Sequence, residues 1–212
     1  ARLTLAGCLP LIDRKRRHAL VFDIGGGSTE LMWLTIGRSG TRMTDWISLP
    51  FGVVSLTERY GHGPFDADRY GAVIEDLQAH LEPFCRRHGI ADMVGRSAVQ
   101  MLGASGTVTT LAGMSLELPR YDRSRVDGSV LAFEAVHRLA GELRGMSVRE
   151  RAGHPCIGRE RADMMVAGCA ILEAMCRQWP VGSLRVADRG LREGILVELM
   201  RRGRQAGGHG GA

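Results

Sequence analysis

Apolar residues in the first fifty positions fall into short runs separated by polar turns. His18–Ile24 contains the continuous apolar run Ala19 to Phe22, which is typical of a strand buried on both faces. Three glycines interrupt the pattern, and apolar residues resume over Glu30–Ile36 and, after a turn at Gly37–Gly40, over Arg42–Leu49. Strands joined by such short links pair antiparallel, so this segment predicts a three-stranded meander.

Beyond position 64 the apolar spacing changes to that of helices. Asp66 is the expected N-cap of a helix that runs to about Arg87 and stops at Gly89. Further helices are expected at Leu3–Leu9, Thr107–Met114, Val130–Arg144, from Ser147 with a capping box to Glu150, at Gly158–Trp179 and at Leu191–Leu199, and further strands at Ala98–Leu102 and Leu184–Ala187. A meander followed by two strand–helix units predicts an α/β fold with a mixed five-stranded sheet flanked by helices.

Composition narrows the class of protein. The 212 residues are 44% apolar, enough for a sizeable core, and only 5% aromatic, which argues against a base-stacking nucleic-acid surface. No apolar run is long enough for a membrane span, so no membrane association is expected. The five cysteines are odd in number and form no C-x-x-C pair, which favours reduced thiols and a cytoplasmic location.

The basic side chains are almost all arginine. The formal net charge is +5, and Lys15 is the single lysine among 28 basic residues. Arginine makes bidentate contacts with phosphate and carboxylate, so a polyanionic partner is compatible with this balance. A coding bias toward arginine codons explains it equally simply.

The most informative local motif is Asp23-Ile-Gly-Gly-Gly-Ser-Thr-Glu30. Successive glycine N–H groups in a turn form a nest for an anion, and Ser28 and Thr29 add hydroxyl donors. Asp23 and Glu30 flank the turn, which suits a divalent metal accompanying phosphate. A Walker loop requires a lysine that is absent here, and a dinucleotide fingerprint requires a helix where this sequence continues as a strand. The remaining alternative is a tight hairpin without a ligand.

Two further motifs follow predicted strands. Gly103-Ala-Ser-Gly-Thr-Val-Thr-Thr110 leads from a strand into a helix, where free N–H groups favour an anion, although a plain capped helix start fits as well. A serine nucleophile elbow is disfavoured because Thr107 stands where that motif needs glycine. Asp188-Arg-Gly-Leu-Arg-Glu-Gly194 offers Arg189 and Arg192 to phosphate, but it fits an ordinary solvated helix cap too.

Together these motifs resemble the exopolyphosphatase and guanosine pentaphosphate phosphohydrolase (Ppx/GppA) family, within the superfamily of sugar kinases, heat-shock chaperones and actin. Val21–Leu31 is similar to the family's second phosphate-binding motif, and Gly103–Ala112 to a later one in which threonine usually stands at the position of Ala104. Arg159–Asp163 and Ala187–Gly194 match as well. The resemblance spans nearly the whole chain.

The resemblance implies a ribonuclease-H-like, actin-like fold with strand order 3-2-1-4-5. It implies a phosphate site at Gly25, Gly26, Gly27, Ser28, Thr29, Ser105, Gly106 and Thr107, with Mg²⁺ held by Asp23 and Glu30. Glu30 is also the expected catalytic residue that helps orient the attacking water. The substrate would be polyphosphate or guanosine pentaphosphate.

The resemblance also implies that a first domain is missing. Its own phosphate motif has no counterpart here, and Ala1-Arg-Leu resembles the segment that directly follows the family's general base, which would lie just upstream of Ala1. Residues 1–17 are then the end of a first-domain helix with a charged loop, 18–202 the second domain, and 203–212 a disordered tail. Apolar surface left uncovered would favour a homodimer, and the chain alone is expected to be inactive.

Two other functions remain open at this point. One is half of a sugar-kinase-like enzyme or ATPase of the same superfamily. The other is a non-catalytic module that binds phosphate or a nucleotide without turnover.

Overall fold

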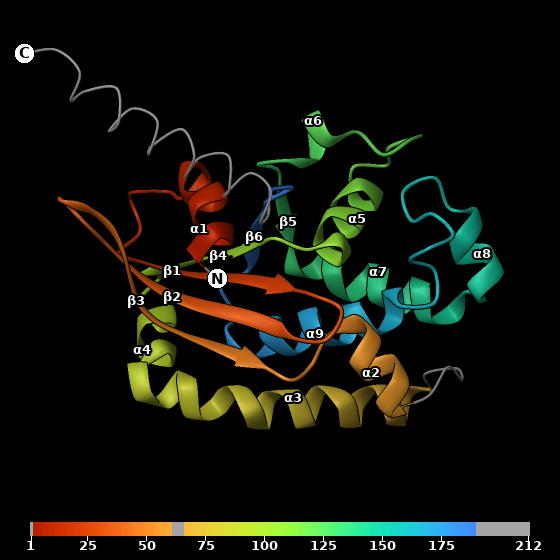
Figure 1. Ribbon diagram of the computed structural model, residues 1–212, viewed down its shortest axis with the longest axis horizontal. Coiled ribbons are helices and arrows are strands. Elements are labelled where there is room, and N and C mark those ends of the chain that lie inside the picture. The colour runs from red at the N-terminus through yellow and green to blue at the C-terminus, as the bar shows by residue number, and fades with distance from the viewer. Residues whose placement is uncertain (1, 61–65, 190–212) are drawn as a thin grey trace, which may run out of the picture.

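The computed structural model describes residues 2–60 and 66–189, and its centre is a mixed six-stranded sheet (Figure 1). The strands are β1 (His18–Ile24), β2 (Thr29–Gly37), β3 (Gly40–Leu49), β4 (Val99–Gly103), β5 (Val130–Ala132) and β6 (Ser183–Val186), in the order β3-β2-β1-β4-β6-β5. The first three pair antiparallel, as predicted, whereas β4 is parallel to both β1 and β6.

Helices cover both faces of the sheet. The helical elements are α1 (Arg2–Cys8), η1 (Leu9–Leu11), α2 (Val53–Tyr60), α3 (Ala67–His88), α4 (Ile90–Gly95), α5 (Gly106–Ser115), α6 (Arg123–Val126), α7 (Phe133–Gly145), α8 (Val148–Gly153) and α9 (Met165–Gln178). Figure 1 shows α1 and α3 on opposite sides of the meander.

Alternation along β1 explains how one strand serves two cores. Leu20 and Phe22 belong to a large cluster with α3, α5, α7 and α9, and Ala19 and Val21 belong to a smaller cluster that includes Cys8 of α1. Successive side chains of a strand point to opposite faces, so a continuous apolar run is what a strand buried on both faces requires. Asp23 follows the same alternation and lies on the α1 face.

Several predicted boundaries are confirmed. Asp66 accepts a hydrogen bond from the N–H of Arg69 and caps α3, which ends at Gly89 in the left-handed conformation with φ 58°. Ser147 and Glu150 form the predicted capping box.

The prediction of five strands is wrong. β5 occupies Val130–Ala132, where the sequence predicted the start of a helix, and α7 begins only at Phe133. Only Leu131 is buried in β5, and three residues are too short a stretch to display a two-residue period. The predicted fifth strand is β6, which does lie beside β4 as expected.

The helix predicted from Gly158 is also shorter than expected and begins at Met165. Gly158 has φ 77°, outside the helical region, and residues 159–164 form turns. The helix predicted at Leu191–Leu199 and the tail from 203 lie outside the described residues.

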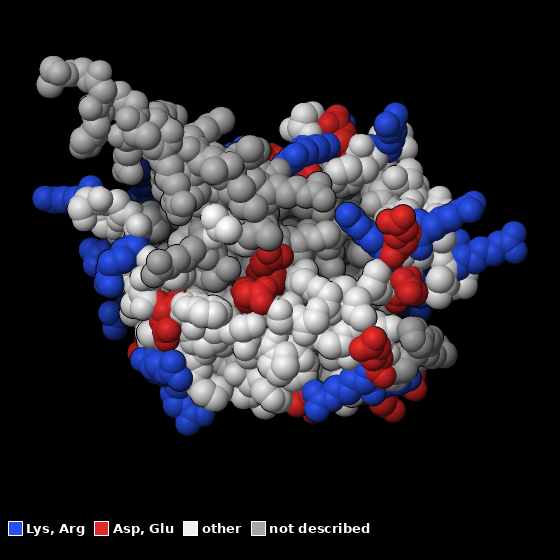
Figure 2. All heavy atoms as spheres, in the orientation of Figure 1, with Lys and Arg blue, Asp and Glu red and all other residues white. Residues whose placement is uncertain are grey.

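Charge is unevenly spread over the visible surface. Blue basic side chains predominate at the left end in Figure 2, around α4 and the turn between β2 and β3, whereas both signs alternate on the right. Within residues 2–60 and 66–189, no helix is long and apolar enough to cross a membrane.

Candidate active site

Two glycine-rich loops leave neighbouring parallel strands at the same edge of the sheet. Gly25–Ser28 follows β1, and Ala104–Ser105 follows β4. The N–H of Ala104 donates to the carbonyl of Phe22 at 2.8 Å, which continues the pairing of the strands to the start of the loops. The parallel arrangement therefore brings together two motifs that lie about eighty residues apart in the sequence.

The peptide groups of the first loop have a defined orientation. The carbonyl of Gly25 accepts from the N–H of Val53 at 3.0 Å, and the carbonyl of Gly26 accepts from the N–H groups of Val54 and Ser55 at 2.8 and 3.1 Å. In a planar trans peptide the C=O and the following N–H point in opposite directions. The N–H groups of Gly26 and Gly27 therefore point away from α2, and within the described part of the chain they donate to no acceptor.

The two flanking carboxylates face each other. Asp23 and Glu30 are directly opposed in the antiparallel pair of β1 and β2, so both side chains lie on the α1 face. Burial and then the neighbouring carboxylate of Glu30 raise the pKa of Asp23 to about 6, although a hydrogen bond from Thr4 of α1 opposes the rise. Two acidic groups held this close favour a shared cation or proton.

Ser28 and Thr29 have different surroundings. The hydroxyl of Ser28 donates to Glu30 Oε1 at 2.6 Å, and Ser48 Oγ lies 3.2 Å from the same oxygen. Thr29 is fully buried, and its hydroxyl donates to the carbonyl of Phe51 at 2.6 Å. The prediction that the Thr29 hydroxyl holds phosphate is therefore not supported, because that hydroxyl faces the core and binds the segment that follows β3.

In the second loop, Ser105 caps α5 by accepting from the N–H of Val108 at 3.1 Å. Thr107 is buried against α9, so closely that a Cβ added at Gly168 would lie 2.1 Å from its Oγ1. The side chains of Ser105 and Thr107 are thus committed to the fold, which leaves the backbone around exposed Gly106 as the part of this loop available to a ligand.

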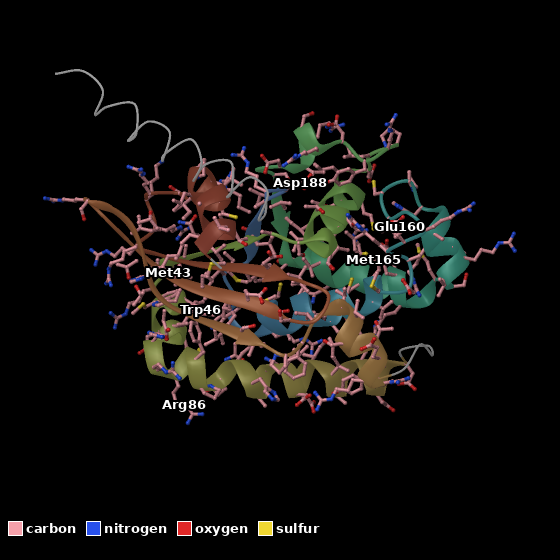
Figure 3. All side chains as sticks on the ribbon, viewed as in Figure 1. Met43, Trp46, Arg86, Glu160, Met165 and Asp188 are labelled. Atoms are coloured by element: carbon pink, nitrogen blue, oxygen red, sulfur yellow. The ribbon has the colours of Figure 1, made fainter. Side chains whose placement is uncertain are left out.

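Two cavities meet at Gly106 and Arg161. The larger, about 480 Å³, is lined among others by Asp23, Ser105, Tyr121 and Asp188. The smaller, about 180 Å³, is lined by Gly25, Gly26, Thr107, Met164 and Met165. Figure 3 labels Asp188 and Met165, which mark the larger and the smaller cavity respectively. The smaller cavity places both predicted phosphate loops around one space.

The third motif is only partly described. Arg189 binds Asp127 with Nη2 to Oδ2 at 2.6 Å, so the guanidinium offered to phosphate by the sequence is already paired, and Arg192 lies outside the described residues. Asp188 accepts from the hydroxyl of Tyr121 at 2.7 Å. Burial and this contact raise the pKa of Tyr121 to about 12.

Several residues around the loops were missed as site residues by sequence reasoning. Gly52 and Ser55 contact the first loop, and Arg161 and Tyr121 line the cavities. Gly52 lies three residues beyond the end of β3, and a glycine between two elements is a usable signal because it permits a close backbone approach. Arg161 also left a signal, because it lies in Arg159–Asp163, one of the segments that match the family. The contacts of Ser55 and Tyr121 depend on which elements the fold brings together.

These observations define an α/β protein in which a glycine loop presents outward N–H groups beside two opposed carboxylates. The chain belongs to the Ppx/GppA phosphatase family, which matches residues 1–203. The family resemblance expected from the motifs is thus confirmed.

Curated relatives carry two kinds of name. The chain is 25% identical over 204 residues to "Exopolyphosphatase 2" of Mycobacterium tuberculosis, covering 94% of this chain and 61% of that protein. It is 29% identical over 185 residues to "Guanosine-5'-triphosphate,3'-diphosphate pyrophosphatase" of Aeromonas salmonicida, covering 86% and 34%. This chain therefore spans less than two thirds of the length of either relative.

Solved structures show the same fold. The PPX-GPPA enzyme of Aquifex aeolicus matches with a TM-score of 0.80 and 26% identity over 93% of this chain and 62% of that one. An exopolyphosphatase-like protein matches with a TM-score of 0.81 and 28% identity, covering 95% and 66%.

Proposed function

We propose that this chain forms the phosphate-holding part of an enzyme that releases terminal phosphate from inorganic polyphosphate or guanosine pentaphosphate by water attack. The names of the relatives support both substrates. The observation that carries the proposal is the pairing of outward N–H groups at Gly26 and Gly27 with the opposed carboxylates of Asp23 and Glu30.

The loop residues have distinct roles in this proposal. N–H groups at Gly26, Gly27 and Ser28 bind phosphate oxygens and stabilise the negative charge of the transferring group. Gly106, at the start of α5, lines the smaller cavity together with Gly25 and Gly26, and is proposed to bind a second phosphate of the substrate. Glu30 also orients the attacking water.

Asp23 and Glu30 fit Mg²⁺ by the chemistry of their donors. Two carboxylates on adjacent strands leave most coordination positions to water and phosphate, the usual arrangement for this ion. The raised pKa of Asp23 indicates that the free pair carries a repulsion that a cation would relieve. When bound, the ion would supply positive charge to the phosphate oxygens. Within the described residues, no third His, Cys, Asp or Glu joins them to form a metal-binding group.

The general base is proposed to come from outside these 212 residues. Asp23 and Glu30 are both engaged by the metal in this proposal, and the relatives are longer than this chain. Turnover is therefore a property proposed for a longer protein that contains this chain.

Substitution of Asp23 tests the assignment. In such a longer protein, Asp23→Asn should lower phosphate release from polyphosphate by about 10²-fold or more, because charge stabilisation at the reacting phosphate is lost. Asp45→Asn is the control, since Asp45 lies on the same sheet but binds Arg87 and His88 instead. Near wild-type turnover of Asp23→Asn at limiting Mg²⁺ would contradict the proposal.

The same assay separates the alternatives. A sugar-kinase-like enzyme or an ATPase would consume ATP in preference to polyphosphate and guanosine pentaphosphate. A non-catalytic module would bind these compounds without releasing phosphate.

A further inference from the structure

Phe51–Ser55 form the corner between β3 and the first turn of α2. This corner lies against the glycine loop and has no part in the chemistry proposed above. We propose that Ser55 in this corner is a positioning residue. Its hydroxyl, together with the close approach of Gly52, holds Gly25–Ser28 in the conformation that presents N–H groups to an anion. The inference rests on the proposed phosphate site and adds a residue to it.

The corner touches both ends of the loop. At one end Val53 donates to the carbonyl of Gly25, and at the other Thr29 donates its hydroxyl to the carbonyl of Phe51. Between these contacts the backbones approach closely. A Cβ added at Gly52 would lie 2.2 Å from the carbonyl oxygen of Gly26 and 2.6 Å from the nitrogen of Gly27. Only glycine permits this approach.

Ser55 contacts the peptide group between Gly27 and Ser28, the third of the loop. Its Oγ accepts from the N–H of Gly52 at 2.8 Å and lies 3.2 Å from the carbonyl oxygen of Gly27. Within the described residues, Ser55 is the donor that reaches this carbonyl, whereas backbone N–H groups of α2 bind the carbonyls of Gly25 and Gly26.

The hydroxyl acts through the loop and not on the ligand. The carbonyl of Gly27 shares its peptide plane with the N–H of Ser28, so fixing the carbonyl on the α2 side fixes that N–H on the opposite side. A hydroxyl has one proton, and Gly52 O at 3.3 Å competes for it. The N–H of Ser28 is therefore oriented through one hydrogen bond, from the Ser55 hydroxyl to the Gly27 carbonyl, and the Gly52 carbonyl competes for that hydroxyl. Substitution of Ser55 tests this orientation.

Three variants of the 212-residue chain isolate this contact. Ser55→Ala removes the hydroxyl, and Ser55→Thr retains it. Thr57→Val is the matched control, because Thr57 is on the same helix and its hydroxyl donates to Val53 O within that helix at 2.6 Å. Thermal unfolding of each variant verifies that the fold is retained.

Two measurements are made on each variant. Backbone NMR relaxation of Gly26, Gly27 and Ser28 in the free chain reports the order of the loop without any ligand. Calorimetric titration with tripolyphosphate and Mg²⁺ reports the affinity. Ser55→Ala should lower the order of Gly27 and Ser28 and weaken binding about fivefold to tenfold, the effect of one lost hydrogen bond. Ser55→Thr should restore both, and Thr57→Val should change neither.

Unchanged loop order in Ser55→Ala would overturn the inference, and so would an equal loss of order in Thr57→Val. Failure of the wild-type chain to bind tripolyphosphate would instead count against the phosphate site, because the relaxation data decide the positioning role without the ligand. Reduced order in Ser55→Ala with unchanged affinity would refute the link between positioning and binding.

Discussion

At the scale of single residues, the glycines around the loop are required for different reasons. Gly25, Gly26 and Gly27 have no positive φ, and the glycines with positive φ in the described chain lie elsewhere, at Gly40, Gly89, Gly128, Gly158 and Gly182. A Cβ at Gly27 would meet nothing within 4 Å, whereas one at Gly52 would collide with the loop backbone. Glycine is therefore essential in the neighbouring corner and not at the apex of the loop.

This contrast gives a matched pair of predictions. Gly52→Ala should lower the free energy of unfolding by about 1–3 kcal/mol, because a collision between backbone atoms is relieved only by moving the corner. Gly27→Ala should leave stability within about 0.5 kcal/mol of wild type. Urea unfolding of the two variants measures both values. Similar stabilities for the two would show that the corner tolerates a side chain and that the close approach of Gly52 to the loop is not essential.

The sequence identified the acidic pair but not the direction of each hydroxyl. Asp23 and Glu30 each lie one residue outside the flanks of the four-residue turn Gly25–Ser28, so pairing of the two strands brings them face to face. Thr29 belongs to the opposite face, with Leu31 and Trp33. That face was hidden because Leu31 to Leu34 are all apolar and buried, which removes the alternation that would have shown it.

At the scale of elements, a buried polar cluster links α3, α7 and α9 on the face away from the carboxylates. Glu173 is 7% exposed and accepts from the hydroxyl of Tyr70 at 2.9 Å and from Arg177 at 2.7 Å, with His137 Nδ1 at 3.2 Å. Burial alone would raise the pKa of Glu173, but hydrogen bonds from Arg177 and Tyr70 lower it overall. The ionised carboxylate therefore stabilises the folded chain.

Glu173→Gln should accordingly destabilise the protein by about 2 kcal/mol at pH 7, since it leaves buried donors poorly paired. A lowered pKa in the folded state means that the stabilisation is complete above the unfolded value, near 4.5, and disappears as the pH falls through the folded value. Urea unfolding at pH 7 and below pH 4.5 should show the difference from wild type narrowing in acid. Glu142→Gln, in an exposed pair with Arg138, is the control and should change stability by less than about 0.5 kcal/mol. A difference that stays constant with pH would contradict this role.

Long periodic elements were predictable and short ones were not. The helix of α3 has seven buried residues at helical spacing and two strong end signals, so its limits agree closely with the sequence. The eight residues of α2 include only two buried ones, Leu56 and Thr57, which is too few to establish a period. The element that orients the glycine loop was therefore invisible in the sequence, because backbone N–H groups make most of its contacts with the loop and the hydroxyl of Ser55 makes the other.

At the scale of the whole molecule, the motifs were sufficient for the family and for the co-location of the two loops. Parallel pairing of β1 with β4 brings the loops together, and the chain matches known structures of the family with TM-scores near 0.8. The cavity walls could not be foreseen in the same way. Tyr121 reaches the cavity from an irregular segment whose path depends on the packing of α5 against α6 and α9.

The last prediction concerns what the 212-residue chain does by itself. It carries outward N–H donors and two carboxylates, and the general base of the proposed reaction is placed outside these 212 residues. Phosphoryl transfer needs oriented phosphate, positive charge and an activated nucleophile in one place. We expect the chain alone to bind tripolyphosphate weakly in the presence of Mg²⁺ and to release no measurable phosphate from polyphosphate or guanosine pentaphosphate. A longer protein that includes this chain should release phosphate, and Asp23→Asn should lower that release by about 10²-fold or more. Calorimetry and a phosphate-release assay on both proteins measure these outcomes. Turnover by the 212 residues at the rate of the longer protein would show that the base lies within this chain.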